Sequence, residues 1–346
     1  MRDFDILSVA RENVKRMKPY SSARDDFKGT ASVFLDANEN PFPQGYNRYP
    51  DPHQRQLKNV IGSLKGVNPD QIFLGNGSDE AIDLLFRVFC EPGNDSMIAP
   101  QPTYGMYAVG AEVNDVEIIK AVLTSEFDLD AQNLLTAITP TTKIIYLCSP
   151  NNPSGNLISH TEIEILLRAF NGIVVVDEAY IDFTDSPSWT NRLAEFKNLV
   201  ILQTLSKAWG LAGLRLGMCF ANEEIISLIN KIKPPYNINT FTQAEALHTI
   251  TTKRALKEKM VKEIITEREN LKINLFKLSR VTHVFPSQAN FLLVKVTKAK
   301  NLYDQLIEKG IVVRDRSTVI LCDDCLRITV GTKEENNQLI QAISSL

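Results

Sequence analysis

The sequence lacks the features that mark a membrane protein, a secreted protein or a nucleic-acid-binding protein. No apolar run approaches about 18 residues without a polar interruption, so no membrane span is expected. The N-terminal stretch MRDFDILSVARENVKRM has no apolar core of the kind found in a secretory signal. The formal net charge is −3 and no block is rich in Lys and Arg, which argues against nucleic acid as a partner. A cytoplasmic enzyme is therefore the default expectation.

Cysteine is scarce, and its pattern favours neither a disulfide framework nor a metal site. The chain has 5 cysteines, an odd number without a secretory signal, so reduced thiols are expected. Cys322 and Cys325 form a single CDDC. Zinc would require two more ligands at suitable spacing, and a redox pair would require a helix start beside it. The two aspartates are typical of a turn between VVRDRSTVIL and LRITV, so no metal is expected.

Seven short runs rich in β-branched residues predict the strands of an α/β domain. Several of these runs are apolar without alternation, as expected for strands that are covered on both faces. Helical patterns lie between some of them, for example TEIEILLRAF at 161–170, so a largely parallel sheet follows. The candidate strands are 71–75, 95–100, 116–122, 142–149, 172–180, 198–205 and 214–221.

The pattern changes after residue 236. A long charged helix is predicted there, and one face carries Leu256, Met260, Ile264, Leu271, Leu275 and Leu278. Short strand candidates follow in NFLLVKV, GIVVRD and LRITVG. We therefore predict an N-terminal arm at 1–35, a large domain at 36–236 and a small α+β domain at 237–346.

The segment VILQTLSKAWGLAGLRLGMCFA carries only two charged residues, Lys207 and Arg215. Desolvating an ammonium group is costly unless it is paired or deprotonated. Taken alone, the segment fits a lysine that extends to the surface, as most lysines in apolar segments do. The rest of the chain favours a chemical role instead.

Other polar residues fall at the carboxyl ends of candidate strands, where open α/β sheets bind ligands. Taken singly, each fits a helix cap, a turn or a salt bridge. Together they fit a ligand with a phosphate, a group that needs a buried carboxylate, and an electrophile for a lysine. Pyridoxal 5′-phosphate has all three, and a helix start is a ready phosphate site. The residues concerned are Ser78, Asp79, Asn152, Asp177, Ser206, Lys207 and Arg215.

Ten motifs, spread over nearly the whole chain, carry a family resemblance. They are KPYSSAR, LDANENPF, NRYPDP, GNGSDEAIDLLFRVF, PTYGMY, SPNNPSG, VVVDEAYIDF, TLSKAWGLAGLRLG, GIVVRDRS and CLRITVGT. With them the chain resembles the fold-type I pyridoxal-phosphate-dependent aminotransferases, and within these the class II family of histidinol-phosphate aminotransferases. The lysine segment and SPNNPSG are specific to the superfamily, and NRYPDP with the two arginine segments narrows the resemblance. It implies a large domain on a mostly parallel seven-stranded sheet and a smaller α+β C-terminal domain.

The resemblance also implies roles at the cofactor ring. Lys207 would form the Schiff base with the cofactor and carry the proton. Asp177 would pair with the ring nitrogen. Tyr180 and Asn152 would bond the ring 3′-oxygen, and Tyr104 would stack on the ring face.

For the cofactor phosphate, the resemblance implies the backbone at Ser78 and Asp79, together with Ser206 and Arg215. Tyr49 in NRYPDP would reach the phosphate held by the neighbouring subunit. The implied assembly is therefore a homodimer with shared active sites.

For the substrates, the resemblance implies reversible ping-pong amino transfer from L-histidinol phosphate to 2-oxoglutarate, giving imidazole-acetol phosphate and L-glutamate. Arg327 would bind the α-carboxylate of glutamate. A guanidinium is better suited to this than a lysine, because it binds a carboxylate through two parallel hydrogen bonds. Arg314 and Tyr20 would bind the substrate phosphate, and Asn38 in LDANENPF is a further candidate for substrate binding. Arg316 shares a face with Arg314 in an extended segment, so the choice of Arg314 rests on the motif.

Two other functions stay open at this stage. An aromatic-amino-acid aminotransferase or a phospho-amino-acid decarboxylase would share the fold, and superfamily motifs do not exclude them. A non-catalytic regulator that kept the cofactor domain is the second alternative. Such regulators usually carry an added DNA-binding domain, for which the sequence before residue 36 offers no room.

Overall fold

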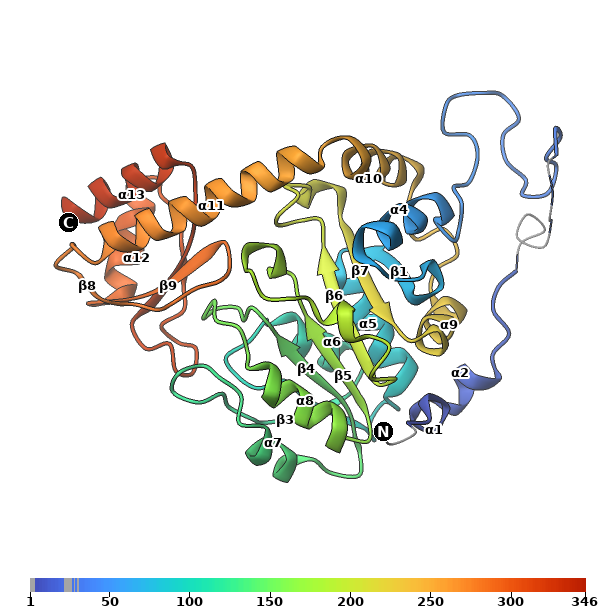
Figure 1. Ribbon diagram of the computed structural model, residues 1–346, viewed down its shortest axis with the longest axis horizontal. Coiled ribbons are helices and arrows are strands. Elements are labelled where there is room, and N and C mark those ends of the chain that lie inside the picture. The colour runs from blue at the N-terminus through green and yellow to red at the C-terminus, as the bar shows by residue number, and fades with distance from the viewer. Residues whose placement is uncertain (1–3, 22–26, 28, 30) are drawn as a thin grey trace.

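The computed structural model describes residues 4–21, 27, 29 and 31–346, and a seven-stranded sheet lies at its centre (Figure 1). The strand order is β1-β7-β6-β5-β4-β2-β3. Only β7 runs antiparallel to its neighbours β1 and β6, so the predicted mostly parallel seven-stranded sheet is confirmed. The strands are β1 Ile72–Asn76, β2 Ser96–Ile98, β3 Glu117–Ile119, β4 Thr142–Cys148, β5 Ile173–Asp177, β6 Leu199–Thr204 and β7 Leu216–Ala221.

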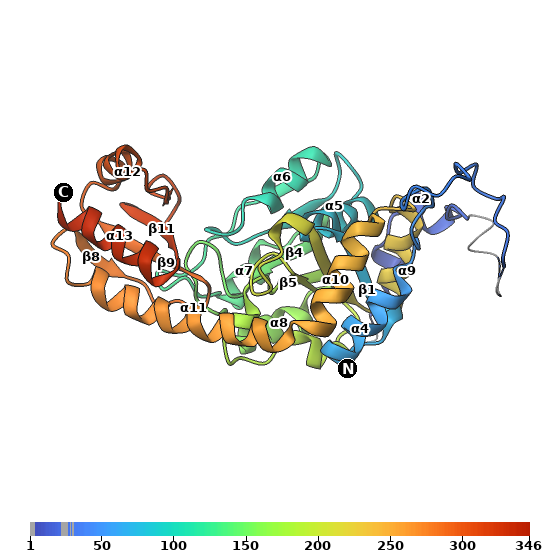
Figure 2. The same ribbon diagram turned by 90° about the horizontal axis from the view of Figure 1, so that it is seen from above.

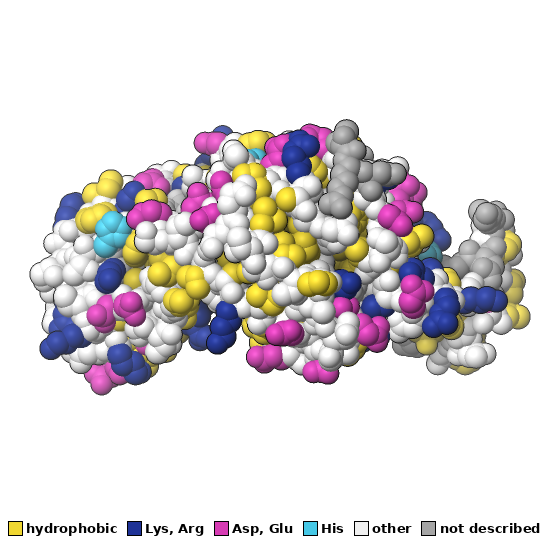
Figure 3. All heavy atoms as spheres, turned by 90° about the horizontal axis from the view of Figure 1, so that it is seen from below, with side chains coloured by type: hydrophobic (Ala, Val, Ile, Leu, Met, Phe, Trp, Pro, Cys, Tyr) yellow, Lys and Arg dark blue, Asp and Glu magenta, His cyan; other side chains and the backbone are white. Residues whose placement is uncertain are grey.

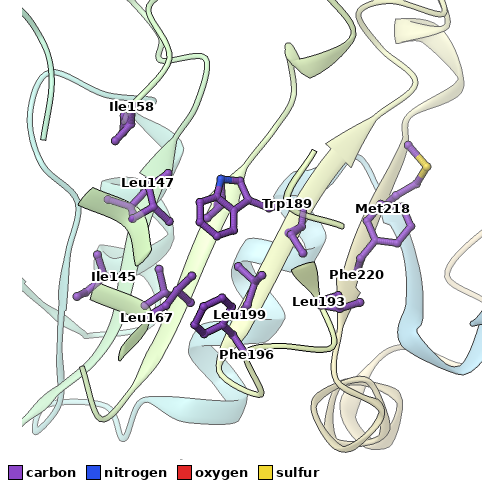
Figure 4. Packing of buried hydrophobic residues seen from close by; sticks show 14 of the residues in the cluster. Ile145, Leu147, Ile158, Leu167, Trp189, Leu193, Phe196, Leu199, Met218 and Phe220 are labelled. Carbon is purple, nitrogen blue, oxygen red and sulfur yellow. The ribbon is translucent and has the colours of Figure 1, made fainter. Parts of the chain in front are cut away.

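Helices cover both faces of this sheet, which explains the apolar runs without alternation. Along β5, Val174 and Val176 belong to one core cluster, and Ile173 and Val175 belong to the other. Figure 4 shows side chains of the first cluster packed around Trp189. Its covering helices are α4 Arg55–Lys65, α7 Ala131–Ala137, α8 His160–Ala169 and α10 Thr240–Thr252. The second face is covered by α5 Ser78–Phe89, α6 Met106–Val113 and α9 Glu223–Ile232, with the short α1 Ile6–Val9 and α2 Glu12–Arg16 packed beside them.

A second, four-stranded antiparallel sheet lies at the C-terminal end of the molecule, away from the N-terminal arm (Figures 1 and 2). Its strand order is β10-β11-β9-β8, and three helices accompany it. The elements are β8 Val281–Val284, β9 Phe291–Val296, β10 Arg314–Asp315, β11 Cys325–Thr329, α11 Arg254–Leu275, α12 Ala299–Glu308 and α13 Lys333–Ser344.

The predicted apolar face of the long helix is only partly correct. Leu271 and Leu275 are buried in the core of the small sheet, but Leu256 is exposed, and Leu278 lies beyond the end of α11. The reason is that the second half of α11 covers the small sheet, whereas its first turns connect this half to α10. Helix α10 itself packs with the large sheet, since Ala246 shares a core cluster with residues of α4. The domain boundary at 236/237 stays a prediction.

The segment at 31–50 extends away from the body of the protein (Figures 1 and 2). It exposes large apolar side chains, among them Leu35 at 89%, Phe42 at 70% and Tyr46 at 72%. On the face shown in Figure 3, basic and acidic side chains are interspersed rather than gathered into a continuous basic surface. None of the helices in the described ranges is long and apolar enough to cross a membrane.

Candidate active site

Nine of the predicted site residues line one pocket at the carboxyl ends of the parallel strands. The cavity in this pocket has a volume of about 140 Å³. Its walls come from the loops that follow β1, β2, β4, β5 and β6, because parallel strands end at the same edge of a sheet. The nine residues are Ser78, Asp79, Tyr104, Asn152, Asp177, Tyr180, Ser206, Lys207 and Arg215.

Asp177 ends β5 and is 2% exposed. The backbone N–H of Ala179 donates to its Oδ1 at 3.0 Å, and the Tyr107 hydroxyl donates to its Oδ2 at 2.7 Å. Burial raises the pKa of the Asp177 carboxyl to about 6, against the opposing effect of the Tyr107 hydrogen bond. Such a carboxylate is suited to pairing with a cationic ring nitrogen, because the cation would offset its desolvation.

Lys207 lies in the loop after β6 and extends into the pocket instead of being buried in a strand. Its Nζ lies 5.6 Å from the centre of the Tyr180 ring. Partial desolvation, followed by the nearby charge of Arg327, lowers the pKa of the Lys207 amine. A lowered pKa increases the fraction of the neutral, nucleophilic amine.

The turn where β1 meets α5 carries groups that are suited to binding an anion. Gly77 is the N-cap of α5, and its N–H donates to the carbonyl of Arg215 at 2.9 Å. Arg215 itself has a φ of 52° and places Nη2 3.5 Å from Asp79 Oδ2. Gly217 is required beside this turn, since a Cβ there would lie 2.1 Å from the Ser78 nitrogen. The free N–H groups of the first helical turn, with a guanidinium next to them, favour a phosphate.

Hydroxyl groups complete the walls of this anion site. The Tyr104 hydroxyl donates to Asp79 Oδ1 at 3.1 Å, so Asp79 holds both the tyrosine and Arg215 in place. The Thr204 hydroxyl donates to Ser206 Oγ at 3.0 Å. The Leu216 carbonyl is a second acceptor for the Thr204 hydroxyl, at 3.3 Å, and the Ser206 hydroxyl can rotate toward a ligand phosphate.

Arg327 connects the small sheet with the pocket. Its Nη1 donates to Asn152 Oδ1 at 2.5 Å, across 175 residues of sequence. Its guanidinium lies 5.4 Å from the ring centre of Phe291, and that ring meets Tyr180 edge-on at 5.1 Å. The small domain thus supplies a cation beside the residues that line the pocket.

Three arginines lie close together on the small sheet. Arg314 of β10 is paired directly with Arg327 of β11. Burial, followed by the positive charges of Arg327 and Arg314, lowers the pKa of Arg316. Arg316 Nε is buried without a hydrogen-bond partner. Like charges opposite one another destabilise a sheet. Over the described residues, no carboxylate lies within ion-pair distance of the three groups, so the cluster is suited to an anionic ligand.

Five predicted residues do not line the pocket: Arg314 and Arg327 belong to the small sheet beside it, and Tyr20, Asn38 and Tyr49 lie apart from it. Tyr20 lies in the arm and is 69% exposed. Asn38 and Tyr49 line a separate hollow, where the Tyr49 ring stacks on Tyr236 with centroids 4.4 Å apart. Their predicted roles therefore depend on a second chain or on movement of the arm.

Cysteines form no disulfide, and all five are free and buried. The turn at CDDC is confirmed, with the N–H of Cys325 donating to the carbonyl of Cys322 at 2.9 Å. The described ranges contain no group of His, Cys, Asp and Glu side chains that could hold a metal ion.

The sequence matches the aminotransferase class I and II family over residues 27–343. The chain belongs to that family. A histidinol-phosphate aminotransferase of Parabacteroides distasonis is 55% identical over 342 residues, which cover 99% of this chain and 99% of that protein. The one from Christiangramia forsetii is 52% identical over 348 residues, which cover 100% of this chain and 99% of that protein.

Solved structures agree with this aminotransferase fold. The histidinol-phosphate aminotransferase from Clostridium acetobutylicum gives a TM-score of 0.80 at 26% identity, over 87% of this chain and 91% of that chain. The enzyme from Sinorhizobium meliloti, in complex with pyridoxal-5′-phosphate, gives a TM-score of 0.79 at 22% identity, over 86% of this chain and 82% of that chain. The resemblance and the fold-type I architecture expected from the sequence are confirmed.

The sequence did not point to Tyr107, which lies behind the lining of the pocket. Tyr107 is fully buried and contacts Asp177 from beneath the pocket floor. It follows Tyr104 by three residues in PTYGMY and lies in the first turn of α6, whereas Tyr104 precedes that helix. The motif contained the signal, but only the fold shows which carboxylate the hydroxyl meets.

Proposed function

We propose that the chain transfers an amino group from L-histidinol phosphate to 2-oxoglutarate, giving imidazole-acetol phosphate and L-glutamate, as a step of L-histidine biosynthesis. In the biosynthetic direction glutamate donates the amine. The observation that carries the proposal is the combination of Lys207, buried Asp177 and the helix-start anion site in one pocket, next to a cluster of arginines. Relatives of about 50% identity over the full length, all named histidinol-phosphate aminotransferases, support the substrate choice.

The donor set of the pocket fits pyridoxal 5′-phosphate. A phosphate suits the N–H groups at Ser78 and Asp79 with Ser206 and Arg215, and a protonated ring nitrogen suits Asp177. Tyr104 offers an aromatic face, and Tyr180 and Asn152 offer polar groups for the 3′-oxygen. The cofactor, when bound, supplies an electron sink for the carbon that loses a proton.

Lys207 performs the proton transfer in this proposal. Its Nζ would take the proton from the substrate carbon that bears the amine, as general base, and would then deliver a proton, as general acid, to the cofactor carbon that receives the amino group. The lowered pKa of the Lys207 amine supports the first step, because a neutral amine is needed to accept the proton. Asp177 stays ionised, and its carboxylate would accept a hydrogen bond from the protonated ring nitrogen.

The arginine cluster accounts for two unlike substrates. Arg327 binds the α-carboxylate of glutamate, and Arg314 binds the phosphate of histidinol phosphate, with Tyr20 and Asn38 as further polar contacts. A group of several arginines can bind either a carboxylate or a phosphate, whereas a single guanidinium in a fixed position suits only one of them.

Substituting the two arginines separately tests the substrate assignment. Arg327→Gln should mainly damage the half-reaction with glutamate, and Arg314→Gln should mainly damage the half-reaction with histidinol phosphate. Each variant should lose roughly 30- to 1000-fold in kcat/KM with the substrate whose anion it no longer pairs. The measurement is the cofactor absorbance after rapid mixing with either amine. Arg316→Gln, one residue beyond β10, serves as the matched comparison.

The outcomes separate the alternatives. Equal losses with both amines in both variants would mean one merged anion site. No loss with histidinol phosphate in either variant would indicate a different amine substrate and favour an aromatic-amino-acid aminotransferase. A phosphothreonine decarboxylase from Porphyromonas gingivalis has the same fold with a TM-score of 0.73 at 24% identity. A decarboxylase would release CO₂ without any need for 2-oxoglutarate.

We also propose a cytoplasmic homodimer with shared active sites. The exposed apolar side chains at 31–50 favour a protein partner, and Tyr49 lies outside the pocket that contains Lys207. A second copy related by a two-fold axis would bring Tyr49 to the phosphate of its neighbour.

Mixed dimers test the shared site. Tyr49→Phe should weaken cofactor binding about tenfold, because one hydrogen bond to a charged group is lost. A dimer of one Tyr49→Phe chain and one Lys207→Ala chain should regain a single site with wild-type affinity. Affinity that is unchanged by mixing, or a protein that sediments as a monomer, would contradict the proposal.

A further inference from the structure

Tyr107 is held rigidly beneath the pocket by aromatic rings. The side chain is fully buried in α6. Its ring stacks on Tyr146 with centroids 4.8 Å apart and planes 15° apart, and it meets Tyr104 edge-on at 5.5 Å. These contacts fix the direction of the Tyr107 hydroxyl, which donates to Asp177 Oδ2 at 2.7 Å.

The hydroxyl remains a donor over the working range of pH. Burial, followed by the charge of Asp177, raises the pKa of Tyr107 well above its usual value. The other oxygen of Asp177 accepts from the backbone of Ala179 at 3.0 Å. Each carboxylate oxygen therefore has one fixed donor and keeps a further lone pair for a ligand.

Other titratable groups face Asp177 from every element packed around it. The negative charge of Asp79 on α5 disfavours its ionised form, and the positive charge of Lys207 favours it. Phenol and thiol groups complete the surroundings, and all have raised pKa values, so they are neutral. These neutral groups are Tyr104, Tyr146, Cys148 and Tyr180.

We propose that Tyr107 is a positioning residue of the amino-transfer reaction, which keeps Asp177 ionised and aimed at the cofactor ring nitrogen. The inference rests on the proposed use of pyridoxal phosphate. Through its edge contact with Tyr104, the same ring also fixes the aromatic side chain expected to stack on the cofactor. One tyrosine thus aligns two groups that would hold the ring from different sides.

The physical consequence concerns the protonation of Asp177. Burial raises the pKa of this carboxyl to about 6, and the Tyr107 hydrogen bond is the largest effect that lowers it. Without the hydroxyl the pKa rises further, so the carboxyl takes up a proton at a higher pH. A protonated carboxyl loses its attraction for a protonated ring nitrogen, and cofactor binding weakens on the acid side.

The test compares Tyr107→Phe with Tyr146→Phe. Both changes remove one buried hydroxyl from the same aromatic stack, but the Tyr146 hydroxyl donates to the carbonyl of Ile82 instead of Asp177. Apoprotein is titrated with pyridoxal phosphate from about pH 5 to about pH 8, and the absorbance of the bound cofactor is recorded. In Tyr107→Phe, the pH at which affinity falls should move up by about one unit, so that affinity near pH 6 drops about fivefold. In Tyr146→Phe it should not move.

An unchanged pH dependence in Tyr107→Phe, or the same shift in Tyr146→Phe, would overturn the inference. A double-mutant cycle gives a second readout: in an Asp177→Asn background, Tyr107→Phe should leave cofactor affinity unchanged. An equal loss in both backgrounds would mean a structural role only. Failure of wild-type protein to bind pyridoxal phosphate would instead contradict the proposed function, so the two results are distinct.

Discussion

Lys207→Ala is expected to purify without covalently attached cofactor and to transaminate more than about 10⁴-fold more slowly than wild type. Two losses combine in this variant. The amine that anchors the cofactor is gone, and so is the group that moves the proton on the substrate carbon. Among the described residues that line the pocket, Lys207 is the one lysine, so no neighbour is placed to take over either task.

Borohydride reduction followed by peptide mapping checks the anchor directly. In wild type the label should appear on the peptide that contains Lys207, and in the variant no peptide should be labelled. Lys207→Arg is the matched control, because it keeps a cation near the Tyr180 ring but has no amine of suitable pKa. It should be as inactive as the alanine variant. A label on another lysine would contradict the site assignment.

The large sheet could be predicted because its strands are short apolar runs covered on both faces. The same argument placed Asp177, Asn152 and Ser206 together, since each follows a strand of one parallel set and parallel strands end at one edge. The direction of β7 was not predictable in this way. An antiparallel strand that is buried on both faces has the same composition as its parallel neighbours.

The small sheet was less predictable, for physical reasons. Strand β8, with the sequence VTHV, is mostly exposed and lacks the apolar run that marks a buried strand. The segment GIVVRD forms only the two-residue strand β10, because its backbone is paired with β11 only near Arg314 and Asp315.

Local sequence patterns do not predict contacts between elements that are far apart in the chain. The hydrogen bond between Arg327 and Asn152 depends on how the small sheet is placed against the large one. The bond from Tyr107 to Asp177 depends on how α6 packs beneath β5. Tyr49 and Asn38 line a different hollow from Lys207, so their predicted roles involve a surface that one chain does not complete.

Asp177→Asn is expected to bind pyridoxal phosphate but to lose about 10³-fold in turnover. The anion site at the start of α5 is untouched, so the cofactor phosphate still has its donors. The neutral amide cannot hold a proton on the ring nitrogen, so charge that develops on the substrate carbon is poorly stabilised. Single-turnover absorbance with either amine measures the loss.

Glu178→Gln is the control for removing a buried carboxylate. Glu178 follows Asp177 directly and is 1% exposed, but it accepts from Ser188, Trp189 and Gln203 and does not line the pocket. Turnover of this variant should stay near wild type. Near-wild-type turnover of Asp177→Asn would instead remove Asp177 from the proposed mechanism.

The pH dependence gives Asp177→Asn a second, independent signature. In wild-type apoprotein the pKa of Asp177 is about 6, above the usual value of 3.8, so the carboxyl is ionised at higher pH and becomes neutral as the pH falls through that value. Wild-type affinity for the cofactor should therefore decline on the acid side of about pH 6. The asparagine has no proton to gain, so the affinity of the variant should lack this decline. A decline of equal size in both proteins would assign the titration to another group and leave Asp177 without a role in holding the ring nitrogen.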